Sequence, residues 1–375
     1  MISNQSTSPR YEALDSLRGL AALVVWGYHL TILPHSSFWD YTPFACGLEA
    51  VRLFFVLSGF VLALPFLDGP VSAPGFLVKR VLRIYPAYLA ALALAVILPG
   101  LCLVASGKPW HLPSLGLLGA YAELIGPVGV SVLPVAWSLV YEMRISLVFP
   151  WLMRGYLKSS SWTWAGAVIL AFVSGAVLDR WLIRIGAPDT FPIGLMYMGM
   201  FMIGISLARH RDRLANWWSA RHFAWRLLIL LGGLLMFTFS FRIVDHLTYD
   251  VAGLLLKEAL VTLAAAIFVV AALAPGRFKR FLGLAPLRFL GRISYSFYLL
   301  HILTIHFFAY WSPFHLGAHP PIVVACSLCT SLLLATLYYY LFERPGVFLG
   351  RRLAARIQTL ERHMTPMQTK GSLET

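Results

Sequence analysis

The sequence has few charged residues, and acidic residues are especially scarce. Asp, Glu, Lys and Arg make up 12% of the 375 residues, whereas hydrophobic residues make up 59%. A soluble domain needs far more charge to cover its surface, so this composition excludes one. Apolar runs of about 20 residues recur along the whole chain, which is typical of helices that cross a bilayer. We therefore expect an all-α integral membrane protein with several spans.

Cysteine is scarce as well. The chain has 4 cysteines, all in or beside apolar segments: Cys46, Cys102, Cys326 and Cys329. The last two are one helical turn apart, but no second pair of ligands accompanies them. No His and Glu pair has the i,i+4 form of a helical zinc site either. We interpret the cysteines as small buried side chains and predict no metal or redox site.

The small number of acidic residues leaves a formal net charge of +14, from 30 Lys and Arg against 16 Asp and Glu. In a soluble protein this excess would favour nucleic-acid binding. In a membrane protein, however, Lys and Arg gather in the cytoplasmic loops. We adopt the second interpretation, and expect a lipid bilayer as partner and no nucleic acid.

We place ten transmembrane helices on the apolar runs, at about 14–33, 45–67, 82–105, 135–153, 162–178, 191–208, 227–244, 251–274, 293–311 and 322–342. Loops on one side hold most of the Lys and Arg residues. Loops on the other side hold only Lys108, Arg180, Arg184 and Arg242. The positive-inside rule then predicts that both termini are cytoplasmic. Residues 1–345 would form one membrane domain and residues 346–375 a cytoplasmic tail, whose first part is basic and partly amphipathic.

The first span carries three ionisable residues, Asp15, Arg18 and His29, inside an apolar run, and the last two are eleven positions apart. At about 100° per residue, eleven positions bring both side chains to one face, about 16 Å apart along the helix axis. Ionisable groups in a membrane helix normally face the protein interior or a wet cavity. This face therefore links a cation near the inner surface to an imidazole placed about 22 Å into the membrane. His301, on the ninth span, is placed at about 12 Å.

Six further ionisable residues fall at the depth of His29: Glu49 and Arg52, Glu142 and Arg144, and Lys257 and Glu258. Equal numbers of each sign indicate a paired polar chamber that could hold a polar substrate. The alternative is that these pairs only join helices, an interpretation that we retain above all for Lys257 and Glu258.

A basic cluster, Lys79, Arg80 and Arg83, lies where the third span begins. Arg80 and Arg83 share a helix face. Together with Arg18 they could form a cationic mouth for a ligand that carries phosphate groups. A positive-inside anchor or a lipid contact explains the cluster equally well.

Six segments, taken in order, resemble the membrane acyltransferase family 3. They extend from residue 14 to residue 345 and read LDSLRGLAALVVWGYH, VRLFFVLSGF, KRVLRIYPAY, PVAWSLVYE, LGRISYSFYLLH and LFERP. The resemblance implies a multi-pass protein of the cell membrane. It also implies transfer of an acyl group, commonly acetyl, from a cytoplasmic coenzyme A thioester to a carbohydrate hydroxyl.

The resemblance also assigns roles to residues. Acetyl-CoA would be bound by Arg18, Lys79, Arg80, Arg83 and Tyr85. The catalytic residues would be His29, as general base on the acceptor hydroxyl, with Glu142 and Arg18. Glu142 would orient the imidazole or hold the sugar. The acceptor would be bound by Glu49, Arg52, Trp137, Ser138 and His301.

Three alternatives stay open. His301 suits the wall of the same cavity, but also a satisfied interior histidine. Direct transfer is preferred to a covalent intermediate on Ser58 or Ser138, because hydroxyl residues in membrane helices usually serve packing and hydrogen bonding. A membrane transporter is the alternative function, because buried charges along a central path also suit solute movement.

Overall fold

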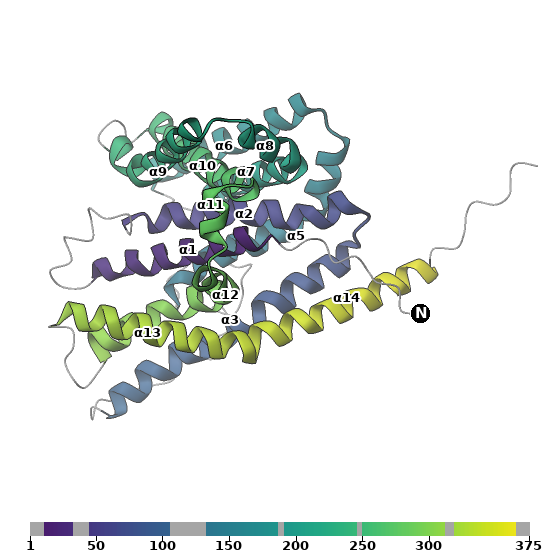
Figure 1. Ribbon diagram of the computed structural model, residues 1–375. Coiled ribbons are helices and arrows are strands. Elements are labelled where there is room, and N and C mark those ends of the chain that lie inside the picture. The colour runs from purple at the N-terminus through teal and green to yellow at the C-terminus, as the bar shows by residue number, and fades with distance from the viewer. Residues whose placement is uncertain are drawn as a thin grey trace, which may run out of the picture.

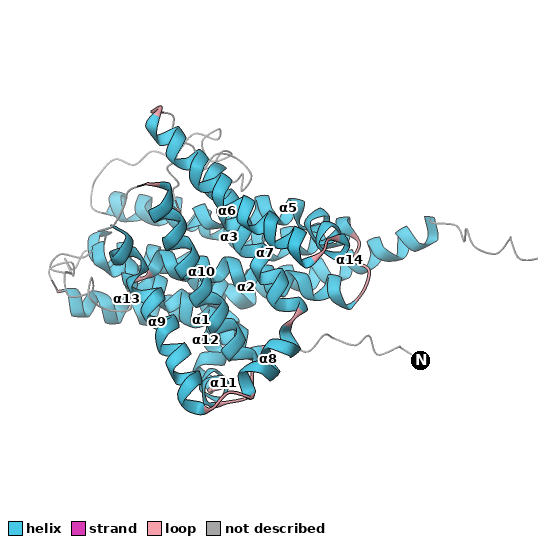
Figure 2. Ribbon diagram, turned by 90° about the horizontal axis from the view of Figure 1, so that it is seen from above, coloured by secondary structure: helices cyan, strands magenta, loops and turns pink. Residues whose placement is uncertain are grey.

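The computed structural model describes residues 11–32, 45–105, 133–186, 191–245, 250–311 and 319–364. These residues form helices and short turns and contain no strand, as Figure 2 shows. The α-helices are α1 (Glu12–His29), α2 (Gly47–Asp68), α3 (Ala73–Ala105), α5 (Trp137–Lys158), α6 (Ser161–Arg184), α7 (Phe191–Arg209), α8 (Arg211–Ser219), α9 (Phe223–Asp245), α10 (Val251–Leu273), α11 (Arg277–Leu282), α12 (Ala285–His306), α13 (Pro320–Tyr338) and α14 (Arg344–Met364).

Each of the ten predicted spans coincides with a helix, and eight of the described helices are long and apolar enough to cross a membrane. The prediction of a polytopic all-α membrane protein is confirmed. The two remaining predicted spans are α1, which holds Glu12, Asp15 and Arg18, and α5, which holds Glu142, Arg144, Arg154 and Lys158; half of the residues of each are buried. The number of spans and the side of the termini stay predictions.

Two helices begin earlier than predicted. The third span was placed at about residue 82, but α3 begins at Ala73. The ninth was placed at about residue 293, but α12 begins at Ala285. In both cases the extra turns are rich in Arg or Lys, which lowers their hydropathy without preventing helix formation.

Helix α1 lies in the interior of the bundle, between α2 and α12 (Figures 1 and 2). It meets α12 at a pair of glycines, because a Cβ atom on Gly19 would lie 2.6 Å from the backbone nitrogen of Gly291. In the same way α2 meets α7 at Gly59 and Gly204, where an added Cβ would come within 2.2 Å of a backbone oxygen. Small residues allow such close helix crossings in membranes.

Residues 320–364 form one long continuous helical rod. A turn of π-helix, η7 (Tyr339–Glu343), joins α13 directly to α14. Helix α14 then runs alongside α3 (Figure 1), where Gly346 and Gly350 allow close approach to Leu82 and Lys79. The expected tail boundary at residue 346 therefore falls inside this rod, and the division into domain and tail stays a prediction.

Candidate functional site

A cavity opens between helices α1, α2, α3, α5 and α12. One part of its wall is apolar and is formed mainly by α2. The other part carries charged and hydroxyl side chains, which are Arg18, Ser58, Arg80, Arg83, Ser138, Glu142, Ser294, Tyr295 and Tyr298. Five predicted site residues from α1, α3 and α5 thus line one cavity: Arg18, Arg80, Arg83, Ser138 and Glu142.

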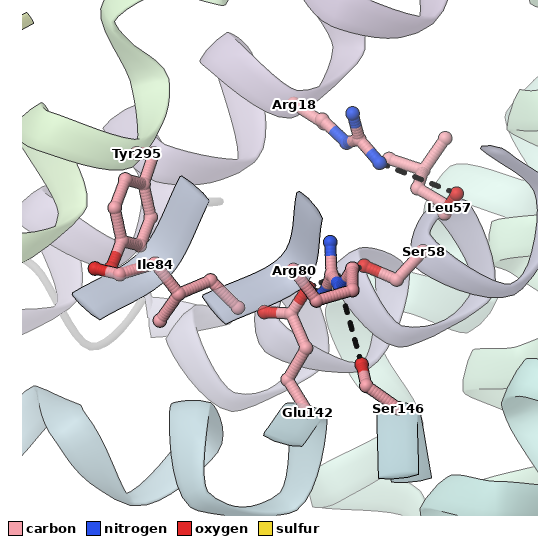
Figure 3. Close-up of polar contacts among 8 residues, drawn as sticks. All are labelled: Arg18, Leu57, Ser58, Arg80, Ile84, Glu142, Ser146 and Tyr295. Atoms are coloured by element: carbon pink, nitrogen blue, oxygen red, sulfur yellow. Dashed lines mark hydrogen bonds and ion pairs between the residues drawn. The ribbon is translucent and has the colours of Figure 1, made fainter. Parts of the chain in front are cut away.

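The centre of the cavity is an ion pair between Arg80 and Glu142 (Figure 3). Arg80 is buried, and its Nε donates a hydrogen bond of 3.2 Å to Ser146 Oγ. Ser58 Oγ donates to the same carboxylate at 3.4 Å. Glu142 therefore fixes the guanidinium group of Arg80, and it contacts α2 and α3 rather than His29.

The other two arginines of the cavity are less constrained. Arg18 Nη2 donates to the carbonyl oxygen of Leu57 at 3.4 Å (Figure 3). Its Nη1 lies 3.7 Å from Asp15 Oδ1. Arg83 makes no ion pair with any residue in the described part of the chain. Three guanidinium groups thus face one lining carboxylate, so the cavity is positively charged and suited to an anion.

Tyrosines of α12 close the remaining wall. Tyr295 donates its hydroxyl hydrogen to the carbonyl oxygen of Ile84 at 2.8 Å, which ties α12 to α3 (Figure 3). Tyr298 donates to the carbonyl oxygen of Val135 at 3.0 Å and lies 2.8 Å from Ser138 Oγ. Either hydroxyl can be the donor in the contact between Tyr298 and Ser138, because Ser138 Oγ also lies within 3.4 Å of the Val135 carbonyl oxygen.

His29 does not line this cavity. Its Nδ1 lies 2.9 Å from the carbonyl oxygen of Val25 and 3.1 Å from Nε2 of His301. Tyr298 stands between the two regions, since it lines the cavity and its ring centroid is 5.8 Å from that of His301. The histidine pair therefore adjoins the cavity at Tyr298, and the path from Arg18 to His29 stays a prediction.

A second buried group of charges lies between α2 and α10. Arg52 donates two hydrogen bonds of 2.5 Å to Glu258, and both side chains are buried. Glu49 is buried nearby, and its Oε1 has no hydrogen-bond partner among the described residues. The helix-joining interpretation thus fits Glu258, whose partner is Arg52 rather than its neighbour Lys257.

The remaining predicted site residues also lie outside the cavity wall. Trp137 packs against Tyr141 and Tyr197. Lys79 is exposed on α3, and Tyr85 is half-buried there beside Tyr88. Their roles in binding stay predictions. Among the described residues, no three His, Cys, Asp or Glu side chains gather in a way that could hold a metal ion.

Sequence reasoning missed two residues of the site, Tyr295 and Ser146. Tyr295 follows Ser294 on α12, and its spacing of three residues from Tyr298, close to one helical turn, places both on the cavity side. Ser146 lies four residues after Glu142, so the two share a face of α5. This spacing of four residues would have been enough to predict that Ser146 lies beside Glu142.

Comparison with known proteins gives a match along most of the chain. The family model described as an acyltransferase domain matches residues 11–340, which include every helix that lines the cavity. A curated relative, described as protein 2 in the picA locus of Rhizobium radiobacter, is 32% identical over 196 residues. The match covers 46% of this chain and 98% of that protein. No solved structure gives a significant match.

Proposed function

The chain belongs to the membrane acyltransferase family 3, and on this premise we propose that it transfers an acyl group, in the first instance acetyl, from acyl-CoA to a carbohydrate hydroxyl at the cell membrane. The observation that carries the proposal is the charge of the cavity. Three arginines line it against one carboxylate, at the meeting point of five helices. The phosphate groups of coenzyme A are ligands of matching charge.

The donor is held by the arginines in unequal ways. Arg80 is already fixed by Glu142 and Ser146, so it presents a rigid positive group. Arg83 has no ion-pair partner in the described part of the chain and supplies the free charge. Arg18 reaches the same space from α1. The thioester then lies at the Tyr298 end of the cavity, one aromatic ring from the histidines.

The reaction is a direct transfer. His29 takes the proton of the acceptor hydroxyl while that oxygen attacks the thioester carbonyl carbon. The new carbon–oxygen bond gives the ester, the carbon–sulfur bond breaks, and the coenzyme A thiolate receives the proton from His29. Glu142 serves this reaction by holding Arg80, and a contact with the sugar is its second proposed role.

Coenzyme A binding tests the donor site. Isothermal titration of purified protein in nanodiscs compares wild type, Arg83→Ala and Arg154→Ala, the last being an exposed arginine of α5 outside the cavity. Loss of one charge-assisted contact, worth about 1.5–3 kcal/mol, weakens binding by Arg83→Ala at least tenfold. Arg154→Ala binds like wild type. Equal affinity of all three proteins would contradict the proposed donor site.

Transfer is measured separately. Radiolabelled acetyl-CoA is added to the purified protein with surface glycans extracted from a strain that lacks it. The proposal predicts label in the glycan fraction. Transport of a sugar or acyl precursor into proteoliposomes without any label transfer would favour the transporter instead.

A further inference from the structure

Helices α1 and α12 are held in a fixed register. Gly19 touches Gly291, and His29 touches His301, and both pairs are separated by 272 residues in the chain. The two helices therefore run parallel with the same spacing, ten residues from the glycine contact to the imidazole contact. Because a Cβ cannot enter at either glycine, the backbones fix the distance between the imidazoles.

The neighbours of His301 determine where its proton lies. Its Nδ1 is 2.8 Å from the carbonyl oxygen of Tyr298 and 3.3 Å from that of Phe297. A carbonyl oxygen only accepts hydrogen bonds, so Nδ1 carries the proton and Nε2 carries a lone pair. His301 is fully buried, so its ring nitrogens make no contact with bulk water in this structure.

The same reasoning extends to His29. Its Nδ1 has two neighbours, the carbonyl oxygen of Val25 at 2.9 Å and Nε2 of His301 at 3.1 Å, and both accept. Nδ1 of His29 therefore carries the proton, shared between the two acceptors. Its Nε2 is left with a free lone pair, the one position from which a neutral imidazole can take a proton.

We propose that His301 is a positioning residue that holds His29 in the tautomer required of a base. This proposal rests on the proposed function. When His29 Nε2 takes the acceptor proton, the imidazolium donates from Nδ1 to His301, which lowers the energy of the charged form. His301 keeps its own proton on Nδ1 throughout, and His29 returns the transferred proton to the leaving thiolate.

A neutral side chain such as His301 is better suited than a carboxylate to orient His29 inside the membrane. No carboxylate oxygen of a described residue forms an ion pair with either imidazole. An unpaired carboxylate at this depth would carry a large desolvation cost, whereas an imidazole is uncharged and satisfied by backbone carbonyls. His301 therefore acts on His29 rather than on the acceptor, in contrast to its predicted role in acceptor binding.

Kinetics on two variants test the proposal. His301→Leu keeps the side chain's bulk but removes the acceptor, and His301→Gln offers an amide oxygen in its place. The expected result for His301→Leu is a kcat about 100-fold below wild type with an unchanged KM for acetyl-CoA. His301→Gln recovers at least tenfold of that loss. Thr336→Val, which removes a hydrogen bond of 2.7 Å to the carbonyl oxygen of Leu332 within α13, stays within threefold of wild type.

Nitrogen-15 NMR of histidine-labelled protein gives a readout that does not depend on activity. The expected spectrum shows the Nδ1-protonated tautomer at both positions, assigned from spectra of His29→Gln and His301→Gln. An Nε2-protonated His29, or a kcat of His301→Leu within threefold of wild type, overturns this inference alone. Full activity of His29→Ala overturns the proposed base itself, so the two failures are distinguishable.

Discussion

Substitution of one glycine should separate the two helices that hold the histidines. A Cβ atom at position 291 would lie 2.5 Å from the backbone carbon and oxygen of Asp15. Ordinary contact needs about 3.5 Å, so Gly291→Ala forces α12 away from α1 by about 1 Å. Backbone atoms cannot rotate aside as a flexible side chain does. The helices therefore have to move as bodies.

The displacement of α12 also changes the distance between the imidazoles of His29 and His301. A shift of about 1 Å takes the 3.1 Å contact between His301 and His29 beyond hydrogen-bonding distance. Overpacking of this kind also lowers the free energy of unfolding by about 1–3 kcal/mol. We therefore expect Gly291→Ala to fold with a lower Tm and to lose most of its acyl transfer.

Thermal unfolding in detergent and transfer of labelled acetyl groups measure both effects. Gly232→Ala is the matched control, since a Cβ at that position of α9 meets nothing within 4 Å. This change should leave activity intact and raise stability slightly, by about 0.5–1 kcal/mol, through helix propensity. If Gly291→Ala and Gly232→Ala have the same Tm and the same activity, the close helix contact does not have the role assigned to it.

Three further predictions concern the buried charges and the topology. Glu142→Ala leaves Arg80 buried without its carboxylate and should cost about 3 kcal/mol of unfolding free energy, whereas Arg154→Ala should cost almost nothing in the same denaturation assay. Arg52→Met alone should reduce the yield of folded protein sharply, and Arg52→Met with Glu258→Met should restore it; a double variant as poor as the single one would refute the pairing. In a variant without the native cysteines, Arg184→Cys should react with an impermeant thiol reagent from outside the cell, and Arg213→Cys should not; the reverse labelling would invert the predicted topology.

Hydropathy and spacing were sufficient to predict the helices and part of the site. Each predicted span is a helix, and Arg18, Arg80, Arg83 and Glu142 do meet in one cavity. This success has a physical basis. Charges in a membrane helix are costly unless they face the interior, so their positions mark the interior face of each helix.

Depth was predicted less well, because it was counted from the first apolar residue of each span. His301 was placed about 10 Å nearer the inner surface than His29. In the structure α12 starts at residue 285 and α1 at residue 12, so positions 301 and 29 lie at similar distances along their helices and the rings touch. The prediction of different depths was wrong, because the first turns of α12 carry arginines and do not register as apolar.

The sequence also did not show which charged residues form ion pairs with each other. Glu142 was expected at the depth of His29, yet it pairs with Arg80. Glu258 was grouped with its neighbour Lys257 in the sequence analysis, yet in the structure it forms an ion pair with Arg52 of α2. Helical periodicity defines which face a residue occupies but not which helix lies opposite, and that depends on tertiary packing such as the glycine contacts of α1 with α12.

The most direct test of the central claim compares transfer and donor binding in one preparation of His29→Ala. The account predicts that transfer of labelled acetyl groups from acetyl-CoA to extracted glycan falls to background, while coenzyme A still binds the arginine-lined cavity with wild-type affinity. Transfer within threefold of wild type would contradict it.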